Sequence, residues 1–182
     1  MRVIAGSARS VPLLSPEGEG TRPTTDRIKE TLFNIIRDDV YDARFLDLFA
    51  GSGQIGIEAL SRGAKRAVFV EKNKKTAELI KKNLEKTKLF ESAKVYRADV
   101  TGAIPQLYAE GEFDIIYMDP PYASETEEAV LKAIGEYGLL AEDGKIIVEA
   151  ALDRRLDTED LPFTVYREKS YKTNKHLFLE RK

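Results

Sequence analysis

The segment Asp119-Pro120-Pro121-Tyr122 carries the residue types best suited to chemistry in this chain. It follows the apolar run 113–118, at the carboxyl end of a predicted strand, which is the edge of an α/β sheet where ligands bind. Because two prolines remove two N–H donors, the Asp119 carboxylate and the Pro120 carbonyl remain as acceptors beside the Tyr122 ring. These acceptors suit a planar –NH2 on a nucleobase, whose lone pair they would free for attack on a sulfonium methyl group. The segment predicts Asp119, Pro120 and Tyr122 as catalytic residues; the alternative is a rigid loop with a helix-capping Asp119.

A second motif, Asp47–Gly56, contains G-x-G-x-x-G between a predicted strand and a predicted helix. The glycines allow a tight turn and close approach of the backbone to a ligand. Glu71 ends the next predicted strand, where its carboxylate can accept both hydroxyls of an adenosine ribose. The motif alone does not choose the nucleotide: a dinucleotide would place its pyrophosphate on the loop, whereas S-adenosylmethionine has no phosphate and Asp47 can hold its ammonium group. The alternative without a ligand is a β–α turn required by sterics.

The elements that must position these motifs alternate between short apolar strands and helices. Predicted strands cover 45–49, 67–70, 94–98, 113–118 and 145–149, and predicted helices cover 26–37, 55–62, 73–87, 101–108 and 125–136. Two short strands, 2–5 and 11–14, precede them, and 163–170 with 175–180 forms a closing antiparallel pair. This alternation predicts an α/β fold with a doubly wound, mostly parallel, Rossmann-like sheet. We expect one domain over 1–182, with an N-terminal hairpin and helix extension (1–40) and a core (41–182).

The amino-acid composition excludes several classes of site. The 182 residues are 42% hydrophobic and 33% charged, which is typical of a globular chain, and they include no cysteine and one histidine. We therefore expect no disulfide, no thiolate nucleophile and no metal site. No apolar run is long enough to span a bilayer, and the apolar part of the start is too short for a secretory signal, so we expect a cytoplasmic protein. We also expect it to be a monomer. Charge is segregated, at +7 over 62–88, −11 over 103–161 and +4 over 162–182, which can mark a nucleic-acid face or reflect ordinary solvated helices.

The chain resembles class I S-adenosylmethionine-dependent methyltransferases that act on amino groups, and more narrowly the RsmD family. That family methylates N2 of a guanine in 16S ribosomal RNA. The resemblance covers essentially the whole chain and rests on four stretches: 2–6, 21–34, 46–53 and 118–122. Two departures stand out. The opening hairpin is less basic than usual in the family, with Arg9 alone in its turn, and Tyr171-Lys172 stands where a Tyr-Gly pair is common.

The resemblance implies S-adenosylmethionine as cofactor and ribosomal RNA, or the small ribosomal subunit, as partner. It also implies that the stretch from Arg22 to Arg27 borders the cofactor pocket and the RNA entrance. The predicted RNA-binding residues are Arg9, Arg22, Arg27 and Lys172. The predicted cofactor-binding residues are Thr24, Thr25, Asp47, Phe49, Gly51, Gly53, Glu71, Lys72, Asp99 and Val100.

Two of these predictions have a purely structural alternative. Thr24 and Thr25 stand at a predicted helix N-terminus, where free N–H groups could bind the methionine carboxylate or the side chains could simply cap the helix. Asp99 could accept from the adenine amino group, with Val100 completing the adenine edge, or could cap a helix. His176 has no acidic or histidine neighbour at ligand spacing, so we expect it to be structural or on the surface.

Guanine presents N1–H and N2–H side by side, a donor pair that the carboxylate of Asp119 could accept together. This favours guanine over adenine, and adenine-N6 methylation of RNA or DNA is the alternative. A nicotinamide-dependent dehydrogenase would account for the glycine motif and Glu71 but not for the proline-rich acceptor segment. A catalytically silent RNA-binding adaptor would not need that segment.

Overall fold

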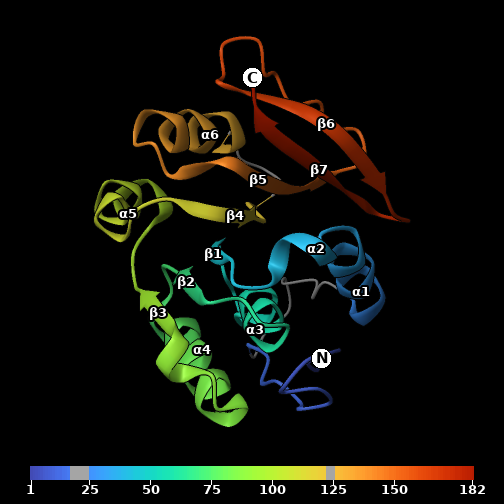
Figure 1. Ribbon diagram of the computed structural model, residues 1–182, viewed down its shortest axis with the longest axis vertical. Helices are drawn as coiled ribbons and strands as arrows, with labels where there is room; N and C mark the ends of the chain where they lie inside the picture. The colour runs from blue at the N-terminus through green and yellow to red at the C-terminus, as the bar shows by residue number, and fades with distance from the viewer. Residues whose placement is uncertain (17–24, 122–125) are drawn as a thin grey trace.

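The computed structural model describes residues 1–16, 25–121 and 126–182. This part of the chain forms a seven-stranded sheet with the order β3-β2-β1-β4-β5-β7-β6 (Figure 1). Its strands are β1 (Arg44–Leu48), β2 (Arg66–Val70), β3 (Ala93–Tyr96), β4 (Phe113–Met118), β5 (Leu140–Ala151), β6 (Phe163–Ser170) and β7 (Asn174–Arg181). Strands β1 to β5 pair in parallel, and β7 pairs antiparallel with both β5 and β6. The predicted doubly wound α/β fold with a closing antiparallel pair is therefore confirmed.

Helices cover both faces of the sheet. The helices are α1 (Asp26–Ile35), α2 (Arg37–Val40), α3 (Gln54–Ser61), α4 (Lys74–Thr87), α5 (Val100–Leu107) and α6 (Thr126–Glu136), with short 3-10 turns at Phe90–Ser92 and Tyr108–Glu110. Residues of α1 to α4 pack in one hydrophobic cluster with one face of the sheet, and residues of α5 and α6 pack in a second cluster on the other face. Thr25, Asn73 and Asp99 cap α1, α4 and α5 by accepting from backbone N–H groups of the first turn.

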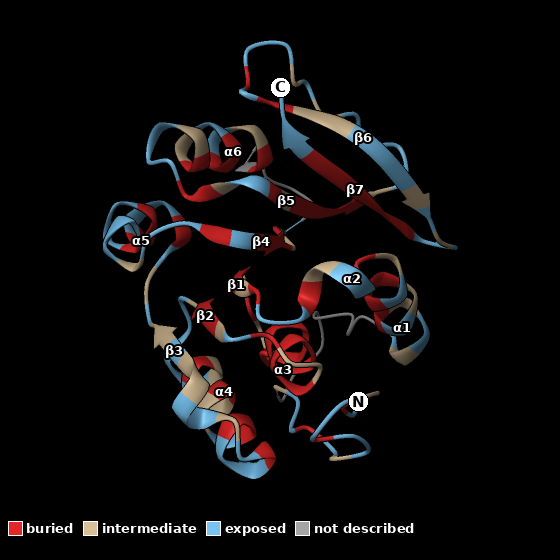
Figure 2. Ribbon diagram, in the orientation of Figure 1, coloured by how far each residue is buried: buried red, intermediate tan, exposed pale blue. Residues whose placement is uncertain are grey.

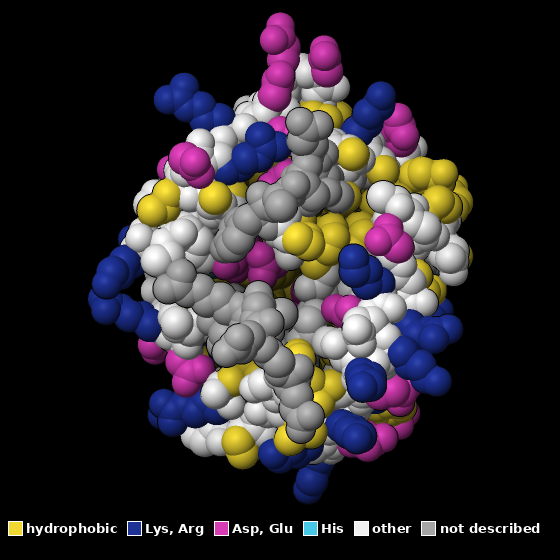
Figure 3. All heavy atoms as spheres, turned by 180° about the vertical axis from the view of Figure 1, so that it is seen from behind, with side chains coloured by type: hydrophobic (Ala, Val, Ile, Leu, Met, Phe, Trp, Pro, Cys, Tyr) yellow, Lys and Arg dark blue, Asp and Glu magenta, His cyan; other side chains and the backbone are white. Residues whose placement is uncertain are grey.

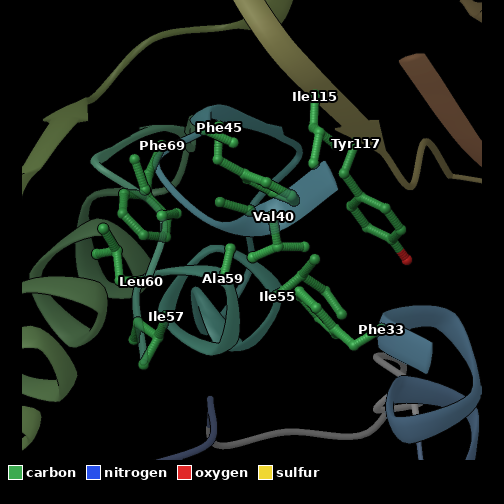
Figure 4. Close-up of a cluster of buried hydrophobic side chains, with 14 of the residues drawn as sticks. Phe33, Val40, Phe45, Ile55, Ile57, Ala59, Leu60, Phe69, Ile115 and Tyr117 are labelled. Atoms are coloured by element: carbon green, nitrogen blue, oxygen red, sulfur yellow. The ribbon is translucent and has the colours of Figure 1, made fainter. Parts of the chain in front are cut away.

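Alternation along the strands divides the core between these clusters. Phe45, Phe69 and Tyr117 face α3 in the cluster shown in Figure 4, whereas Leu46 and Leu48 face the opposite layer. Every residue of α3 is buried, because the sheet lies on one side of it and the N-terminal segment on another, as the burial colours in Figure 2 show. The helix that follows the glycine motif therefore lies inside the molecule.

The N-terminal segment differs from the prediction. The expected strands 2–5 and 11–14 are reduced to one β-bridge, Arg2 with Pro12, with backbone hydrogen bonds from Val3 N to Val11 O and from Leu13 N to Met1 O on either side of it. The reason is competition from side chains of α3: Ile4 and Ala5 donate their N–H groups to the Glu58 carboxylate at 2.8 and 3.0 Å. These donors are unavailable for a strand ladder, so the segment packs on α3.

Other boundaries shift as well, and β3, predicted over 94–98, ends at Tyr96. The predicted helix 26–37 ends at Ile35, where the short helix α2 takes over, and β5 begins at Leu140 instead of 145. Strand β1 ends at Leu48, which leaves Phe49 in the following turn. Among the described residues, no helix is long and apolar enough to cross a membrane.

Candidate active site

A cavity of about 1140 Å³ opens at the carboxyl ends of β1, β2 and β4. Since the chain leaves β1 and β4 toward opposite faces of the sheet, their ends diverge and leave a crevice between them. Figure 3 shows a face of the molecule that is hollowed near its centre, with acidic side chains inside the hollow and Lys and Arg side chains around it. The acidic residues that line the cavity are Asp47, Glu71, Asp99, Asp119 and Glu149.

The turn after β1 has the backbone shape that its glycines predict. Gly51 and Gly53 have φ of 55° and 77°, and Phe49 also lies in the left-handed region at φ 62°, a conformation that costs a non-glycine residue energy. A Cβ on Gly56 would lie 2.4 Å from the Phe69 ring, so only glycine fits at that position. The turn therefore brings residues 49–52 to the cavity wall, where Phe49 and Gly51 line it. Gly53, also predicted to bind the cofactor, does not line the cavity and is buried on the side of Ile80 and Ile57.

Asp47 on β1 holds the glycine turn in place. Its carboxylate accepts from the Gly56 N–H at 2.9 Å, which ties the end of β1 to α3. Burial raises the pKa of Asp47 well above its usual value, and the nearby Asp119 and Glu71 carboxylates raise it further, against the lowering effect of the Gly56 bond. A cationic ligand group would favour ionisation of Asp47.

Glu71 is held in place by two backbone groups. Its Oε2 accepts from Gly51 N at 3.0 Å and its Oε1 accepts from Asn73 N at 2.7 Å. These bonds join the end of β2 to the glycine turn, and they orient a carboxylate on the cavity wall. Lys72, beside it in the chain, also lines the cavity and is exposed.

Asp99 caps α5 and lines the cavity as well. Its Oδ1 accepts from both the N–H and the hydroxyl of Thr101, at 3.1 and 2.7 Å, and these bonds lower the pKa of Asp99. The capping alternative is thus present in the structure, while Val100 lies next to it on the same wall. A ligand role for Asp99 stays a prediction.

Asp119 and Pro120 lie at the end of β4 on the cavity floor. Burial, together with the neighbouring Glu149 carboxylate, raises the pKa of Asp119 to about 8. Tyr122, the third predicted catalytic residue, lies outside the described residues, as do Thr24 and Arg22.

A buried polar cluster beneath Asp119 was missed by the sequence reasoning. Glu149, near the end of β5, accepts from the Tyr117 hydroxyl at 2.6 Å and from the Asn174 amide. His176 is fully buried, with its Nε2 lying 3.5 Å from Glu149 Oε2 and its Nδ1 3.0 Å from the Tyr171 hydroxyl. A signal was available for Glu149, which ends an apolar strand as Glu71 does. His176 was expected to be structural or on the surface, and it is buried. Its contact with Glu149 left no signal, because the two residues are distant in sequence.

Comparison with known proteins places the chain in a family. A family model described as Conserved hypothetical protein 95 matches residues 1–180. The ribosomal RNA small subunit methyltransferase D (RsmD) of Haemophilus influenzae is 38% identical over 173 residues, which is 93% of this chain and 88% of that protein. This chain belongs to the RsmD family.

Two further relatives agree with this assignment. YlbH of Bacillus subtilis is 44% identical over 166 residues, covering 91% of this chain and 88% of that protein. A solved structure of the Escherichia coli protein yhhF has a TM-score of 0.86 and 34% identity, and the match covers 100% of this chain and 98% of that one. The fold of this chain is thus shared with a solved structure over its whole length.

The basic residues predicted from the RsmD resemblance fall in two places. Arg27 and Lys172 line the main cavity, whereas Arg9 lines a separate hollow of about 300 Å³ that Arg27 also borders. Thr25 lines the main cavity and caps α1 by accepting from Ile28 N at 3.3 Å. Within the described ranges, no group of three or more acidic or histidine side chains is arranged to hold a metal ion.

Proposed function

We propose that this protein is an S-adenosylmethionine-dependent methyltransferase that modifies N2 of a guanine in 16S ribosomal RNA. The observation that carries the proposal is the position of the Asp119 and Pro120 acceptors, on the floor of the same cavity that the glycine turn and Glu71 line. Family relatives named ribosomal RNA small subunit methyltransferase D support the reaction class and the RNA.

The charge of the cavity supports the cofactor. S-adenosylmethionine, when bound, supplies an electrophilic methyl group on a positively charged sulfonium. Asp47, Glu71 and Asp99 would hold its ammonium, ribose and adenine groups, respectively, because carboxylates accept from cations, hydroxyls and amines. The pyrophosphate of a nicotinamide dinucleotide would instead meet several carboxylates, which is unfavourable. The acidic lining therefore argues against a dehydrogenase.

Asp119 and the Pro120 carbonyl would hold the hydrogens of the guanine amino group. This interaction strengthens as the nitrogen becomes pyramidal, so it stabilises the transition state more than the ground state. A base inside a duplex is shielded by stacking, so the target must be unpaired or flipped into the cavity. Arg27 and Lys172 at the cavity wall would attract the RNA backbone, which makes binding sensitive to salt.

The test is methyl transfer from labelled S-adenosylmethionine to 16S RNA and to small ribosomal subunits, followed by analysis of the modified nucleoside. We expect N2-methylguanosine, a large loss of single-turnover rate in Asp119→Ala with cofactor affinity nearly intact, and a smaller loss in Asp119→Asn. Asp143→Asn is the matched control, because Asp143 is exposed on β5 away from the cavity lining. N6-methyladenosine as product would favour the adenine alternative, and tight binding of NAD without binding of S-adenosylmethionine would refute the proposal.

A further inference from the structure

Glu149 lines the cavity and is held there by a network of buried polar side chains. Its two carboxylate oxygens accept from Tyr117 on β4 and from Asn174 on β7, and His176 lies beside it. In Figure 4 the Tyr117 ring borders the hydrophobic cluster while its hydroxyl points away from that cluster. Tyr171 contacts the far side of the His176 ring. The Glu149 carboxylate is therefore fixed by residues from two strands that flank β5 in the sheet.

This carboxylate lies next to Asp119. Met118 of β4 pairs with Val148 of β5 in parallel register, so the residues that follow them, Asp119 and Glu149, stand side by side at the sheet edge. Both line the cavity. Burial opposes ionisation of Glu149, but the nearby His176 ring and the hydrogen bonds from Tyr117 and Asn174 outweigh it and lower the Glu149 pKa, while the pKa of Asp119 is raised. The pKa values of two neighbouring carboxylates are thus shifted in opposite directions.

We propose that Glu149 is a positioning residue for the proposed methyl transfer, on which this inference rests: its fixed negative charge keeps Asp119 basic enough to take the proton that the amine must lose. The amine nitrogen gains a bond to the methyl carbon as the carbon–sulfur bond breaks, and the electron pair of that bond stays on sulfur. One N–H bond of the same nitrogen then breaks, its electron pair stays on nitrogen, and the proton forms an O–H bond at Asp119. Water later removes this proton when the product leaves.

A base works best when its pKa lies near the working pH, because it is then both ionised and strongly proton-accepting. An ordinary aspartate, with a pKa of about 3.9, is ionised but weak. Like-charge repulsion from Glu149 raises the pKa of Asp119 toward the working pH. The hydrogen-bond partners of Glu149 keep Glu149 itself ionised, so the proton binds Asp119. The contacts of Glu149 with Tyr117, Asn174 and His176 therefore act on Asp119 indirectly, through Glu149.

Other ionisable groups line the same cavity as Asp119. They are Asp47 on β1, Tyr117 on β4, Glu149 on β5, Lys169 on β6, Arg27 on α1, Glu71 and Lys72 after β2, Asp99 before α5, and Tyr171 and Lys172 beside the β6–β7 turn. Glu149 is the charged neighbour that raises the Asp119 pKa. Its removal should therefore move the Asp119 titration more than the removal of any distant carboxylate.

The first experiment needs no substrate. Carboxyl carbons of aspartate are labelled with ¹³C in the wild-type protein, Asp119 is assigned by its missing signal in Asp119→Asn, and the signal is followed with pH. We expect a midpoint about 3–4 pH units above that of an ordinary aspartate. A midpoint close to the ordinary value would overturn the inference, whatever reaction the protein catalyses.

The second experiment uses Glu149→Gln, which is close in shape and neutral. The variant can keep its partners, because its carbonyl accepts from Tyr117 and its amide can donate to Asn174 Oδ1 once the Asn174 amide, which now donates to Glu149, turns over. We expect the rise of kcat/KM with pH to move down by about one to three units. The plateau kcat should fall about tenfold, since the base is weaker, while affinity for S-adenosylhomocysteine stays unchanged.

Glu180→Gln is the matched control, because it removes an exposed carboxylate from β7, the strand that carries His176. Its pH profile and kcat should match the wild type. An unchanged pH profile in Glu149→Gln would refute the positioning role, and so would a loss of cofactor affinity in proportion to kcat. Failure of the wild type to methylate RNA would instead refute the proposed function, while the ¹³C titration still tests the carboxylate pair.

Discussion

A buried ion cluster attaches the N-terminal segment and α1 to α3, and its central residue is Glu58. The Glu58 carboxylate accepts from two backbone N–H groups of the segment and from Arg62 Nε at 2.8 Å, and it lies 3.5 Å from the Lys29 ammonium. Lys29 has no exposed surface, and its ammonium also donates to the Arg2 carbonyl. Burial lowers the pKa of Lys29, and the Glu58 charge opposes that effect.

Glu58→Gln removes the counter-charge and leaves the Lys29 ammonium buried. Breaking a buried pair in this way costs about 3–5 kcal/mol of unfolding free energy. Lys29→Met removes the buried cation instead and leaves Glu58 with Arg62, so we expect about 1–2 kcal/mol from lost hydrogen bonds. The double variant should be less destabilised than the sum of the single variants by about 1–3 kcal/mol, since the second change removes the charge that the first one stranded.

Urea unfolding at neutral pH, followed by circular dichroism, measures these free energies. The slope of the unfolding free energy against urea concentration should be the same in all variants, so that the urea midpoints report stability alone. The Lys81–Glu78 pair on α4 serves as control: it is exposed, so Lys81→Met and Glu78→Gln should leave the midpoint unchanged. Strict additivity of Glu58→Gln and Lys29→Met would show that the two charges are not coupled, and the reasoning would fail.

Three further predictions concern cofactor binding, the glycine turn and the target base. Glu71→Ala should weaken S-adenosylmethionine binding by about 1.5–3 kcal/mol in calorimetry, because hydrogen bonds to a charged group are lost, and unchanged affinity would exclude a ligand role. Gly56→Ala should lower the unfolding free energy by about 1–3 kcal/mol, since the new Cβ would meet the Phe69 ring, whereas Gly102→Ala on α5 meets open space and should raise it by about 0.5–1 kcal/mol. Tyr122→Ala should lose about 1–3 kcal/mol in kcat/KM through lost stacking on the base while Tyr122→Phe keeps most activity, and equal damage by both would mean that the ring does not stack.

The sequence was most informative where local patterns determine the structure. Glu71 and Asp119 each follow an apolar run, and Asp47 lies near the end of another; in a parallel sheet the ends of such strands meet at one edge, so their shared cavity could be expected. Their ligand and catalytic roles stay predictions. The glycine turn was also predictable, because positive φ and the close approach of Phe69 both require glycine.

Prediction from the sequence failed where the local structure depends on side chains that are distant in sequence. Nothing near His176 in the sequence indicates that an antiparallel pairing places it opposite Glu149. The first residues alternate as strands do, yet Glu58, more than fifty positions away, takes their N–H donors. Both misses involve a charged side chain that reaches across the fold, and such contacts leave no periodic pattern.

The strand order divides the cavity between two parts of the chain. Residues that would hold the cofactor follow β1, β2 and β3 on one side, whereas Asp119, Glu149 and the β6–β7 hairpin lie on the other. Exchange of the hairpin between relatives would therefore alter the wall that meets the target and leave the methyl-donor half intact. Recombination at this boundary offers a route by which one ancestral donor site could come to serve different RNA targets, and by which an engineer could redirect it.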